Sequence, residues 1–297
     1  LRNSVSCSRS FLQFSRSSCS GAVVITDPNS GEILACVSYP GYDSNRLANQ
    51  MDVQYYQELN SDLSQPFYNK ATQQKTAPGS TFKLVTSVGG LLEGVIDDNS
   101  IIQCTGVFDK ISGSPLRCWY HQGHGLLDIR GGITNSCNVY MSEIAYRMGL
   151  DENGVFSDNQ APQKLTTYAE LFDFDKNSGI EISEADPEVS DQMPIPSAIG
   201  QGTHNYTTSQ LARYVTTLAN SGTSYQISLL DKVTDSSGNL VEDYTPGVES
   251  QLDVPDYIWD DVHVGMHGVI TETNEASFSD LEVSLAGKTG TAQLVRN

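Results

Sequence analysis

Three short stretches of this sequence carry side chains that together can do nucleophilic chemistry. In the first, Ser80-Thr81-Phe82-Lys83, a hydroxyl stands three residues before an amine. Residues three apart lie on the same side of a helix, so this spacing puts a nucleophile beside a base. Serine attacks only when a base takes its proton. A lysine amine can be that base only if burial or another cation lowers its pKa from about 10.4.

The second stretch is Ser136-Cys137-Asn138. The Ser136 hydroxyl can pass a proton to a leaving amine, and the Asn138 amide can hydrogen-bond to both a substrate amide and Lys83. Cys137 has no basic neighbour in the sequence, which favours a packing role over a reactive one. Ser136 and Asn138 would also serve as ordinary caps of the helix that follows.

The third stretch is Lys288-Thr289-Gly290-Thr291, in a segment with a strand pattern. Lys288, Thr289 and Thr291 suit a substrate carboxylate, and Lys288 would help to lower the pKa of Lys83 from across a cleft. Gly290 leaves the strand bare, so that an extended peptide can pair with it. Each stretch has an ordinary explanation alone, such as a helix cap or a solvated lysine, but the three in this order favour one active site.

The surrounding patterns predict the elements that hold these stretches. Apolar residues at helical spacing predict a helix over 81–93, directly after Pro78 and Gly79. Strands toward both ends of the chain, with helices between them, predict an α+β fold in which one sheet is covered by helices. Further helices are expected at 139–149, 166–172, 207–222 and 256–270, and strands at 22–26, 32–38, 227–233 and 283–295, with 40–75 as an irregular connection.

The composition limits the partners. The 297 residues have a net charge of -19 and a pI of about 4.4, which argues against nucleic acid or an anionic membrane surface as a partner. No apolar run is long enough to span a bilayer. Residues 1–20 are rich in Ser, Arg and Cys and contain no Asp or Glu, so they are expected to be a disordered or foreign end without an assigned function.

Six cysteines are spread over the chain, and two of them flank a stretch of turn residues. Cys104 and Cys118 could meet across this hairpin as a disulfide, or stay as two buried free thiols. His121 and His124 follow closely, but the spacing of these four residues matches no structural zinc pattern. We therefore expect neither a metal nor a cofactor.

Taken together, the three stretches resemble the active site of the penicillin-binding proteins and serine β-lactamases. Most of the chain after residue 20 looks like the transpeptidase domain of a class B penicillin-binding protein. The resemblance implies one such domain over 21–297, with an antiparallel sheet covered by helices on both faces, but without the last strands and the C-terminal helix. It is carried by the segments 21–39, 71–83, 123–138, 199–222 and 286–293.

For the chemistry, the resemblance implies a D,D-transpeptidase that crosslinks peptidoglycan stem peptides through a serine acyl-enzyme. The partners that it implies are stem peptides ending in D-Ala-D-Ala, β-lactam antibiotics and a peptidoglycan glycosyltransferase. The place that it implies is the outer face of a bacterial cell membrane, to which the parent protein is anchored. The implied catalytic residues are Ser80, Lys83, Ser136, Asn138 and Lys288, with Thr289, Gly290 and Thr291 binding substrate and the backbone N–H groups of Ser80 and Thr291 forming the oxyanion hole.

Two alternatives stay open. Serine β-lactamases of class D share Ser-Thr-Phe-Lys but carry a hydrophobic residue where Asn138 stands, and class A enzymes need a glutamate base for which the sequence shows no convincing candidate. A β-lactam sensor would keep the acyl-enzyme as its signal, with its signalling domain outside this chain. Because the family pattern continues past Asn297, the piece alone is expected to have an exposed sheet edge and low stability, and it could be inactive.

Overall fold

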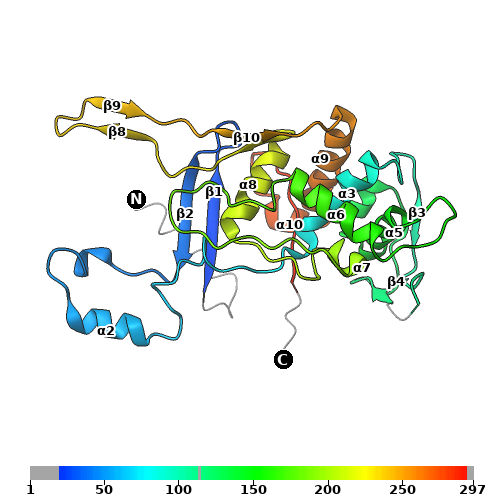
Figure 1. Cartoon of the computed structure of the whole chain (residues 1–297), viewed down its shortest axis with the longest axis horizontal. Helices are drawn as coiled ribbons and strands as arrows, with labels where there is room; N and C mark the ends of the chain where they lie inside the picture. The colour runs from blue at the N-terminus through cyan, green and yellow to red at the C-terminus, as the bar shows by residue number, and fades with distance from the viewer. Residues whose placement is uncertain (1–19, 113–114, 293–297) are drawn as a thin grey trace. The chain divides into compact units, whose positions relative to one another are not determined.

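In the computed structural model, residues 20–112 and 115–292 are described, and they form two compact units (Figure 1). The sheet unit contains the described residues up to Lys75 together with Lys176–Pro187 and Tyr206–Ser250. The helical unit contains Thr76–Asp175, Glu188–Asn205 and the described residues from Gln251 onward. The expected foreign end, 1–20, lies outside the described residues except for residue 20. No helix among the described residues is both long and apolar enough to cross a membrane.

The sheet unit is built on an antiparallel hairpin, as the sequence predicted. Strands β1 (Gly21–Thr26) and β2 (Ile33–Tyr39) pair directly, and helix α8 (Thr208–Ala219) packs against β1 (Figure 1). A small core of three buried isoleucines, Ile33, Ile180 and Ile227, joins the hairpin to two later segments of the unit. The other elements of the unit are η1 (Ser44–Arg46), α2 (Val53–Ser61), β7 (Thr223–Tyr225), β8 (Lys232–Thr234), β9 (Leu240–Asp243) and β10 (Val248–Gln251), which pair as β7 with β10 and β8 with β9.

Helix α8 is fixed at its start by a capping box. The Thr207 hydroxyl accepts from the backbone N–H of Gln210, and the Gln210 side chain accepts from the backbone N–H of Thr207. This exchange satisfies two N–H groups that a helix start otherwise leaves unpaired. The buried Arg213 then donates to the carbonyls of Lys176 and Asn177, so this helix also holds the 176–187 segment in the sheet unit.

The helical unit packs around α3 (Lys83–Leu92), which is buried over nearly its whole length. Two glycines of α3 let neighbouring helices approach closely. A Cβ added at Gly90 would lie 2.6 Å from Ile144 on α5 (Asn138–Met148), and one at Gly89 would lie 2.6 Å from the Tyr168 ring on α6 (Gln160–Leu171). The elements of this unit are η2 (Gly79–Phe82), α3, β3 (Ile102–Cys104), β4 (Val107–Phe108), β5 (Leu116–Arg117), β6 (Gly125–Leu127), α4 (Ile129–Thr134), α5 (Asn138–Met148), α6 (Gln160–Leu171), α7 (Pro194–Ser197), α9 (Asp256–Thr271) and α10 (Glu275–Phe278).

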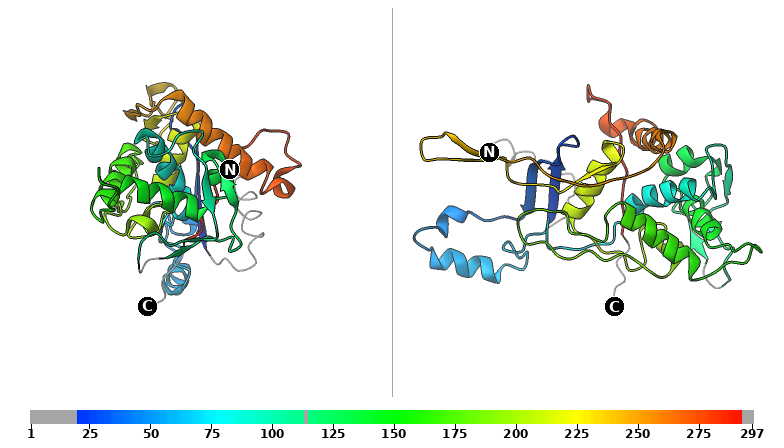
Figure 2. Two further views of the ribbon diagram at one scale, coloured as in Figure 1. Left: turned by 90° about the vertical axis from the view of Figure 1, so that its right-hand side faces the viewer. Right: turned by 45° about the horizontal axis from the view of Figure 1, so that its top comes forward.

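Helices α4 and α9 form a second close contact of the helical unit (Figure 2). Gly265 of α9 faces Ile133, and Gly268 faces Thr134, with no room for a methyl group at either glycine. The Thr134 hydroxyl donates to the Gly265 carbonyl at 3.0 Å. This packing fixes the end of α4, which leads directly into the second predicted active-site stretch.

The mixed helix-and-strand class is as predicted, and so are the helices at 139–149, 207–222 and 256–270. The strand expected at 283–295 is wrong for its described part, because residues 283–292 belong to none of the sheets. A strand needs a hydrogen-bonded neighbour, and the described residues supply none for this segment; 293–295 lie outside the description. The helix expected at 166–172 starts earlier, at Gln160, and the connection 40–75 contains α2.

Candidate active site

Ser80 lies in η2, the tight turn that leads into α3. The turn begins at Gly79, whose φ of 55° favours glycine, and the Gly79 N–H donates to the Gly200 carbonyl at 2.9 Å. The Thr81 hydroxyl donates to the Pro78 carbonyl at 2.8 Å. Ser80 is therefore carried on a turn pinned on both sides, immediately before the first turn of a buried helix.

Lys83 is the first residue of α3, and its side chain is fully buried. Its Nζ donates to the Ser136 carbonyl and to Asn138 Oδ1, each at 2.6 Å, and lies 3.2 Å from Ser136 Oγ. Burial, and next the positive charge of Lys288, lower the pKa of Lys83 from its ordinary value to about 7. A large part of this amine is therefore neutral near pH 7, as a base must be.

The Ser136-Cys137-Asn138 stretch joins α4 to α5. Ser136 has a left-handed backbone with φ of 47°, which costs a non-glycine residue about 1–2 kcal/mol. It is held there because the Ser136 N–H donates to the Ile133 carbonyl and the Cys137 N–H to the Gly132 carbonyl. Strained backbone of this kind occurs at functional sites, where surrounding contacts hold it.

Cys137 and Asn138 start α5. The Cys137 sulfur accepts from the Tyr140 N–H and so caps the helix. The Asn138 amide donates to the Arg117 carbonyl at 3.0 Å while its oxygen accepts from Lys83. Both sides of the Asn138 amide are thus used, which fixes its orientation.

Lys288 reaches the same place from the far end of the chain. Its Nζ donates to Ser136 Oγ at 2.8 Å and to the Thr289 carbonyl at 3.1 Å. Burial lowers the pKa of Lys288 to about 8, so it still carries its proton through most of the neutral range. Ser136 Oγ therefore lies beside two amines, of which Lys83 loses its proton at the lower pH.

The Gly290-Thr291 backbone lies against the turn that carries Ser80. A Cβ added at Gly290 would lie 3.0 Å from the Pro78 carbonyl oxygen, and one added at Gly79 would overlap the backbone of Thr291. Gly79 must be glycine because a side chain there would overlap Thr291, and at Gly290 a side chain would fit only if its neighbours moved. The predicted bare stretch thus borders the nucleophile.

One residue of this region was not predicted from the sequence to lie at the site. Gln201 follows α7 and its side chain donates to the Thr291 carbonyl at 3.4 Å. The signal was the glycine on either side of it, Gly200 and Gly202, each with a positive φ. Segment 199–222 belongs to the family resemblance, but no site role was expected for Gln201.

Of the two alternatives for Cys104 and Cys118, the structure shows two buried free thiols, and the alternative of a disulfide is wrong. Their sulfurs instead face one imidazole nitrogen, His124 Nδ1, at 3.6 and 3.5 Å. A third sulfur, that of Cys137, lies 3.9 Å from Cys118. The residue spacing that gave no zinc pattern did not include Cys137. In the structure, Cys137 lies with Cys104, Cys118 and His124 in one group.

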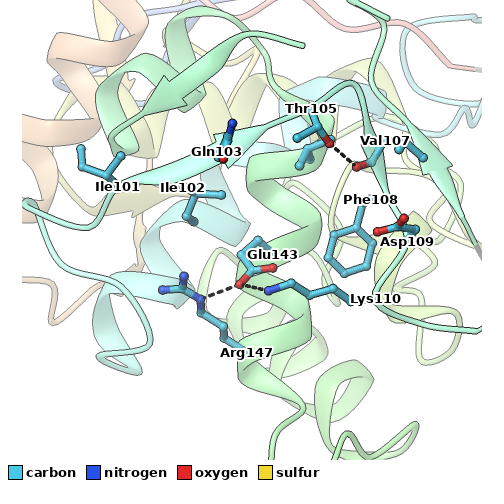
Figure 3. A pocket seen from close by; sticks show the side chains of 11 residues that line it. Ile101, Ile102, Gln103, Thr105, Val107, Phe108, Asp109, Lys110, Glu143 and Arg147 are labelled. Carbon is cyan, nitrogen blue, oxygen red and sulfur yellow. Dashed lines mark hydrogen bonds and ion pairs between the residues drawn. The ribbon is translucent and has the colours of Figure 1, made fainter. Parts of the chain in front are cut away.

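A cavity of about 310 Å³ is lined by residues of β3, β4 and α5, and its wall contains an ion-pair cluster (Figure 3). The largely buried Glu143 accepts from Lys110 at 2.7 Å and from Arg147 at 3.0 Å. None of the predicted site residues lines this cavity. The cluster holds α5 against β4 and its following loop, and thereby supports Asn138 at the start of the helix.

The sequence-predicted residues thus converge as expected in the helical unit. Lys83, Ser136, Asn138 and Lys288 form one hydrogen-bonded cluster, and Ser80 lies on the turn that leads into Lys83. Two amines of lowered pKa on one serine hydroxyl, with a second serine on the adjoining turn, can perform acyl transfer with proton exchange.

Comparison with known proteins agrees with this geometry. The family model of the penicillin binding protein transpeptidase domain matches residues 21–297. The chain is 30% identical over 298 residues to the peptidoglycan D,D-transpeptidase MrdA of Haemophilus influenzae, an alignment that covers 92% of this chain and 43% of that protein. The chain therefore spans less than half the length of this curated relative.

Two solved structures resemble the fold. The Pseudomonas aeruginosa PBP2 structure in complex with WCK 5153 has a TM-score of 0.78 at 26% identity, covering 92% of this chain and 60% of that one. A structure of a peptidoglycan synthase complex, described as coordinating polymerization and crosslinking, has a TM-score of 0.79 at 26% identity, covering 93% of this chain and 46% of that one.

Proposed function

Because the chain belongs to the penicillin-binding protein transpeptidase family, we propose that it is the catalytic domain of a peptidoglycan D,D-transpeptidase. Ser80 attacks the carbonyl of the penultimate D-alanine of a stem peptide, and the terminal D-alanine leaves. An amine on a neighbouring stem peptide then takes the acyl group and forms the crosslink. β-Lactams acylate the same serine and stay bound.

One observation carries this proposal: two lysine nitrogens meet one serine oxygen. Lys83 Nζ and Lys288 Nζ lie 3.2 and 2.8 Å from Ser136 Oγ. Two cations this close repel each other, which favours loss of the proton from the more deeply buried Lys83. The repulsion supplies the neutral base that a serine nucleophile needs.

The proposed proton path follows from this pair. Neutral Lys83 takes the proton of Ser80 as its oxygen attacks, and Ser136 passes a proton to the departing amine. Lys288 keeps its own proton and attracts the terminal carboxylate of the substrate. Asn138 orients Lys83 through Oδ1 and binds the substrate amide with the hydrogen-bonding capacity that Lys83 and Arg117 leave unused.

The substrate is proposed to lie along the Thr289–Thr291 stretch as an added strand. Gly290 leaves room there, and this stretch has no strand partner among the described residues. Thr289 and Thr291 contribute hydroxyls to the carboxylate. The backbone N–H groups of Ser80 and Thr291 are proposed as the oxyanion hole, supported by the close contact between their segments.

The proposed partners and location follow from the relatives. The peptidoglycan synthase complex, which couples polymerization to crosslinking, supports a peptidoglycan glycosyltransferase as a partner. Stem peptides ending in D-Ala-D-Ala are the proposed substrate. Peptidoglycan is built outside the cytoplasm, so the domain is proposed to act at the outer face of the cell membrane.

The test is covalent labelling with a fluorescent penicillin. The purified protein should be labelled, Ser80→Ala should lose the label, and Ser236→Ala, a change in an exposed turn, should keep it. Crosslinking of a D-Ala-D-Ala peptide to an added amine should accompany labelling. Fast steady-state hydrolysis of a chromogenic cephalosporin would instead show a β-lactamase, and labelling without any crosslinking would show a sensor.

A further inference from the structure

A pocket of the helical unit, separate from the cavity beside Glu143, has no part in the proposed reaction. Its volume is about 500 Å³, which is within the range of pockets that hold small ligands. The described residues that line it come from the segment around the start of β5, the start of α6 and the segment that leads into α7, and all belong to the helical unit. None of them belongs to the catalytic cluster.

The lining of this pocket combines apolar side chains with two carboxylates. Asp158 and Asp191 are the charged residues among its described lining, which contains no Lys, Arg or His. Both are exposed, and neither carboxylate makes a hydrogen bond or an ion pair with another described residue. A pocket lined by charges of one sign attracts the opposite charge, and its apolar wall suits an aliphatic chain behind that charge. This Asp158–Asp191 pocket therefore fits a side chain that ends in a protonated amine.

The segment that carries Asp191 is held by contacts within the chain. The buried hydroxyls of Ser190 and Ser197 lie 2.8 Å apart, and they lie 3.1 and 2.7 Å from the Gln192 carbonyl oxygen. Met193, the next residue, has a left-handed backbone with φ of 52°, a strained conformation that persists only where surrounding contacts hold it. The Asp191 wall is therefore preformed, which lowers the free-energy cost of binding a ligand there.

One wall of the pocket leads directly to the catalytic cluster. Leu116, which lines the pocket, precedes Arg117, whose carbonyl accepts from the Asn138 amide at 3.0 Å. The same amide accepts from Lys83 through its oxygen at 2.6 Å. Following this path of bonds and hydrogen bonds, Leu116 Cα lies at most about 14 Å from Lys83 Nζ.

The opposite wall leads to the turn that carries the nucleophile. Pro196 lines the pocket, and four residues later the Gly200 carbonyl accepts from the Gly79 N–H at 2.9 Å. Helix α7, which contains Pro196, packs against both α5 and α6. The two walls are thus continuous with a segment that orients Asn138 and with a segment that supports the Ser80 turn.

We propose that the Asp158–Asp191 pocket binds the side chain of the residue that precedes the two D-alanines of the stem peptide that acylates Ser80, and that this side chain ends in a protonated amine. The inference rests on the proposed function, in which Ser80 takes the acyl group of the penultimate D-alanine and Asn138 binds the substrate amide. That amide joins the penultimate D-alanine to the residue before it. The preceding residue therefore lies next to the Asn138–Arg117 contact, where the pocket wall begins.

The dimensions of the peptide agree with this assignment. Two extended residues advance about 7 Å, and a side chain of lysine length adds about 6 Å, which is close to the upper limit of the path from the cluster to Leu116. The carboxylates of Asp158 and Asp191 then attract the ammonium group, and the apolar wall contacts the methylene groups. The attacking amine of the neighbouring stem peptide must contact the acyl carbon at Ser80, so it is not the group that this pocket holds.

The pocket is tested by peptide binding to Ser80→Ala, which cannot be acylated. Nα-acetyl-L-lysyl-D-alanyl-D-alanine should bind about 3- to 30-fold more tightly than its norleucine analogue in an NMR titration at low salt, because two exposed carboxylates each contribute modestly. The analogue with glutamate in place of lysine should bind more weakly than either. The preference for lysine should shrink in about 0.5 M NaCl, since salt screens exposed charges.

Variants in the same background identify the groups responsible. Asp158→Asn combined with Asp191→Asn should remove the preference for lysine over norleucine, and Asp191→Lys should favour the glutamate peptide. Asp260→Asn, a change of an exposed carboxylate on α9 outside the pocket, should keep the preference for lysine. Equal binding of the lysine and norleucine peptides, including no binding of either, would overturn the proposal, as would a preference that survives in the double variant.

One further peptide tests the assignment to the acylating stem peptide. Nα-acetyl-L-lysine amide, which lacks the D-alanines, should bind more weakly than the tripeptide; equal binding would show an independent amine site and refute the assignment. Because binding to Ser80→Ala needs no acylation, it is separate from penicillin labelling of the wild type. Labelling without a preference for lysine would remove the pocket and leave the transpeptidase, and a preference without labelling would do the reverse.

Discussion

Replacing Lys288 by methionine should move the pH dependence of Ser80 acylation to higher pH. The proposed acylation needs neutral Lys83, whose pKa is lowered to about 7, first by burial and then by the charge of Lys288. Removing that charge stabilises protonated Lys83, so its pKa rises and less of it is neutral at any given pH. The acid limb of the rate profile, which reports this pKa, therefore moves upward.

The size of the shift follows from the distance. Both nitrogens lie near Ser136 Oγ, at 3.2 and 2.8 Å, so at most about 6 Å separates them. Two unit charges at about 6 Å repel by about 0.7 kcal/mol in a water-like medium and by about 2.8 kcal/mol at an effective dielectric constant of about 20. These energies correspond to about 0.5 to 2 pKa units, which would slow acylation at pH 7 by about 2- to 50-fold.

The assay is the rate of fluorescent penicillin labelling from about pH 5.5 to 9.5, measured at saturating probe so that weaker binding does not enter. Lys288→Arg is the matched control, since it keeps the charge and should leave the acid limb near pH 7. An acid limb that stays in place in Lys288→Met, or moves to lower pH, would refute the idea that the second lysine sets the base.

Three further changes test the surrounding geometry. Asn138→Leu removes the hydrogen bond to Lys83 and should slow labelling by about 10²-fold with little loss of stability; unchanged labelling would contradict its role. Gly290→Val fills the contact with the Ser80 turn and should abolish labelling at a similar melting temperature, whereas full labelling would show that the two segments do not meet. Gly268→Ala overlaps Thr134 and should lower the free energy of unfolding by about 1–3 kcal/mol in a denaturant titration; an unchanged midpoint would contradict the tight α4–α9 packing.

Elements with local signals were predictable from the sequence. The β1–β2 hairpin has two short, mainly apolar runs around a turn, and α8 starts at a capping box on Thr207. Helix α5 ends at Gly149, as its pattern indicated. The hydrogen-bonded cluster of Lys83, Ser136, Asn138 and Lys288 was also predictable, because three short stretches with distinct polar residues specify it together.

Features that depend on tertiary neighbours were not predictable in the same way. A strand over 283–295 fits its own residues, but a strand exists only beside a partner, and the described residues provide none. The cysteine and histidine cluster combines three hairpin residues with Cys137 from the start of α5. Because Cys137 is the middle residue of a catalytic stretch, its pattern gave no reason to group it with the others.

The most direct test of the central claim is mass spectrometry of the protein after reaction with penicillin. Trypsin should release the peptide Thr76–Lys83, and fragment ions can separate Ser80 from Thr81 within it. The geometry predicts one penicilloyl group per chain, attached to Ser80 and formed faster as Lys83 loses its proton near pH 7. A stable adduct on any other residue, or no adduct on a folded protein, would contradict it.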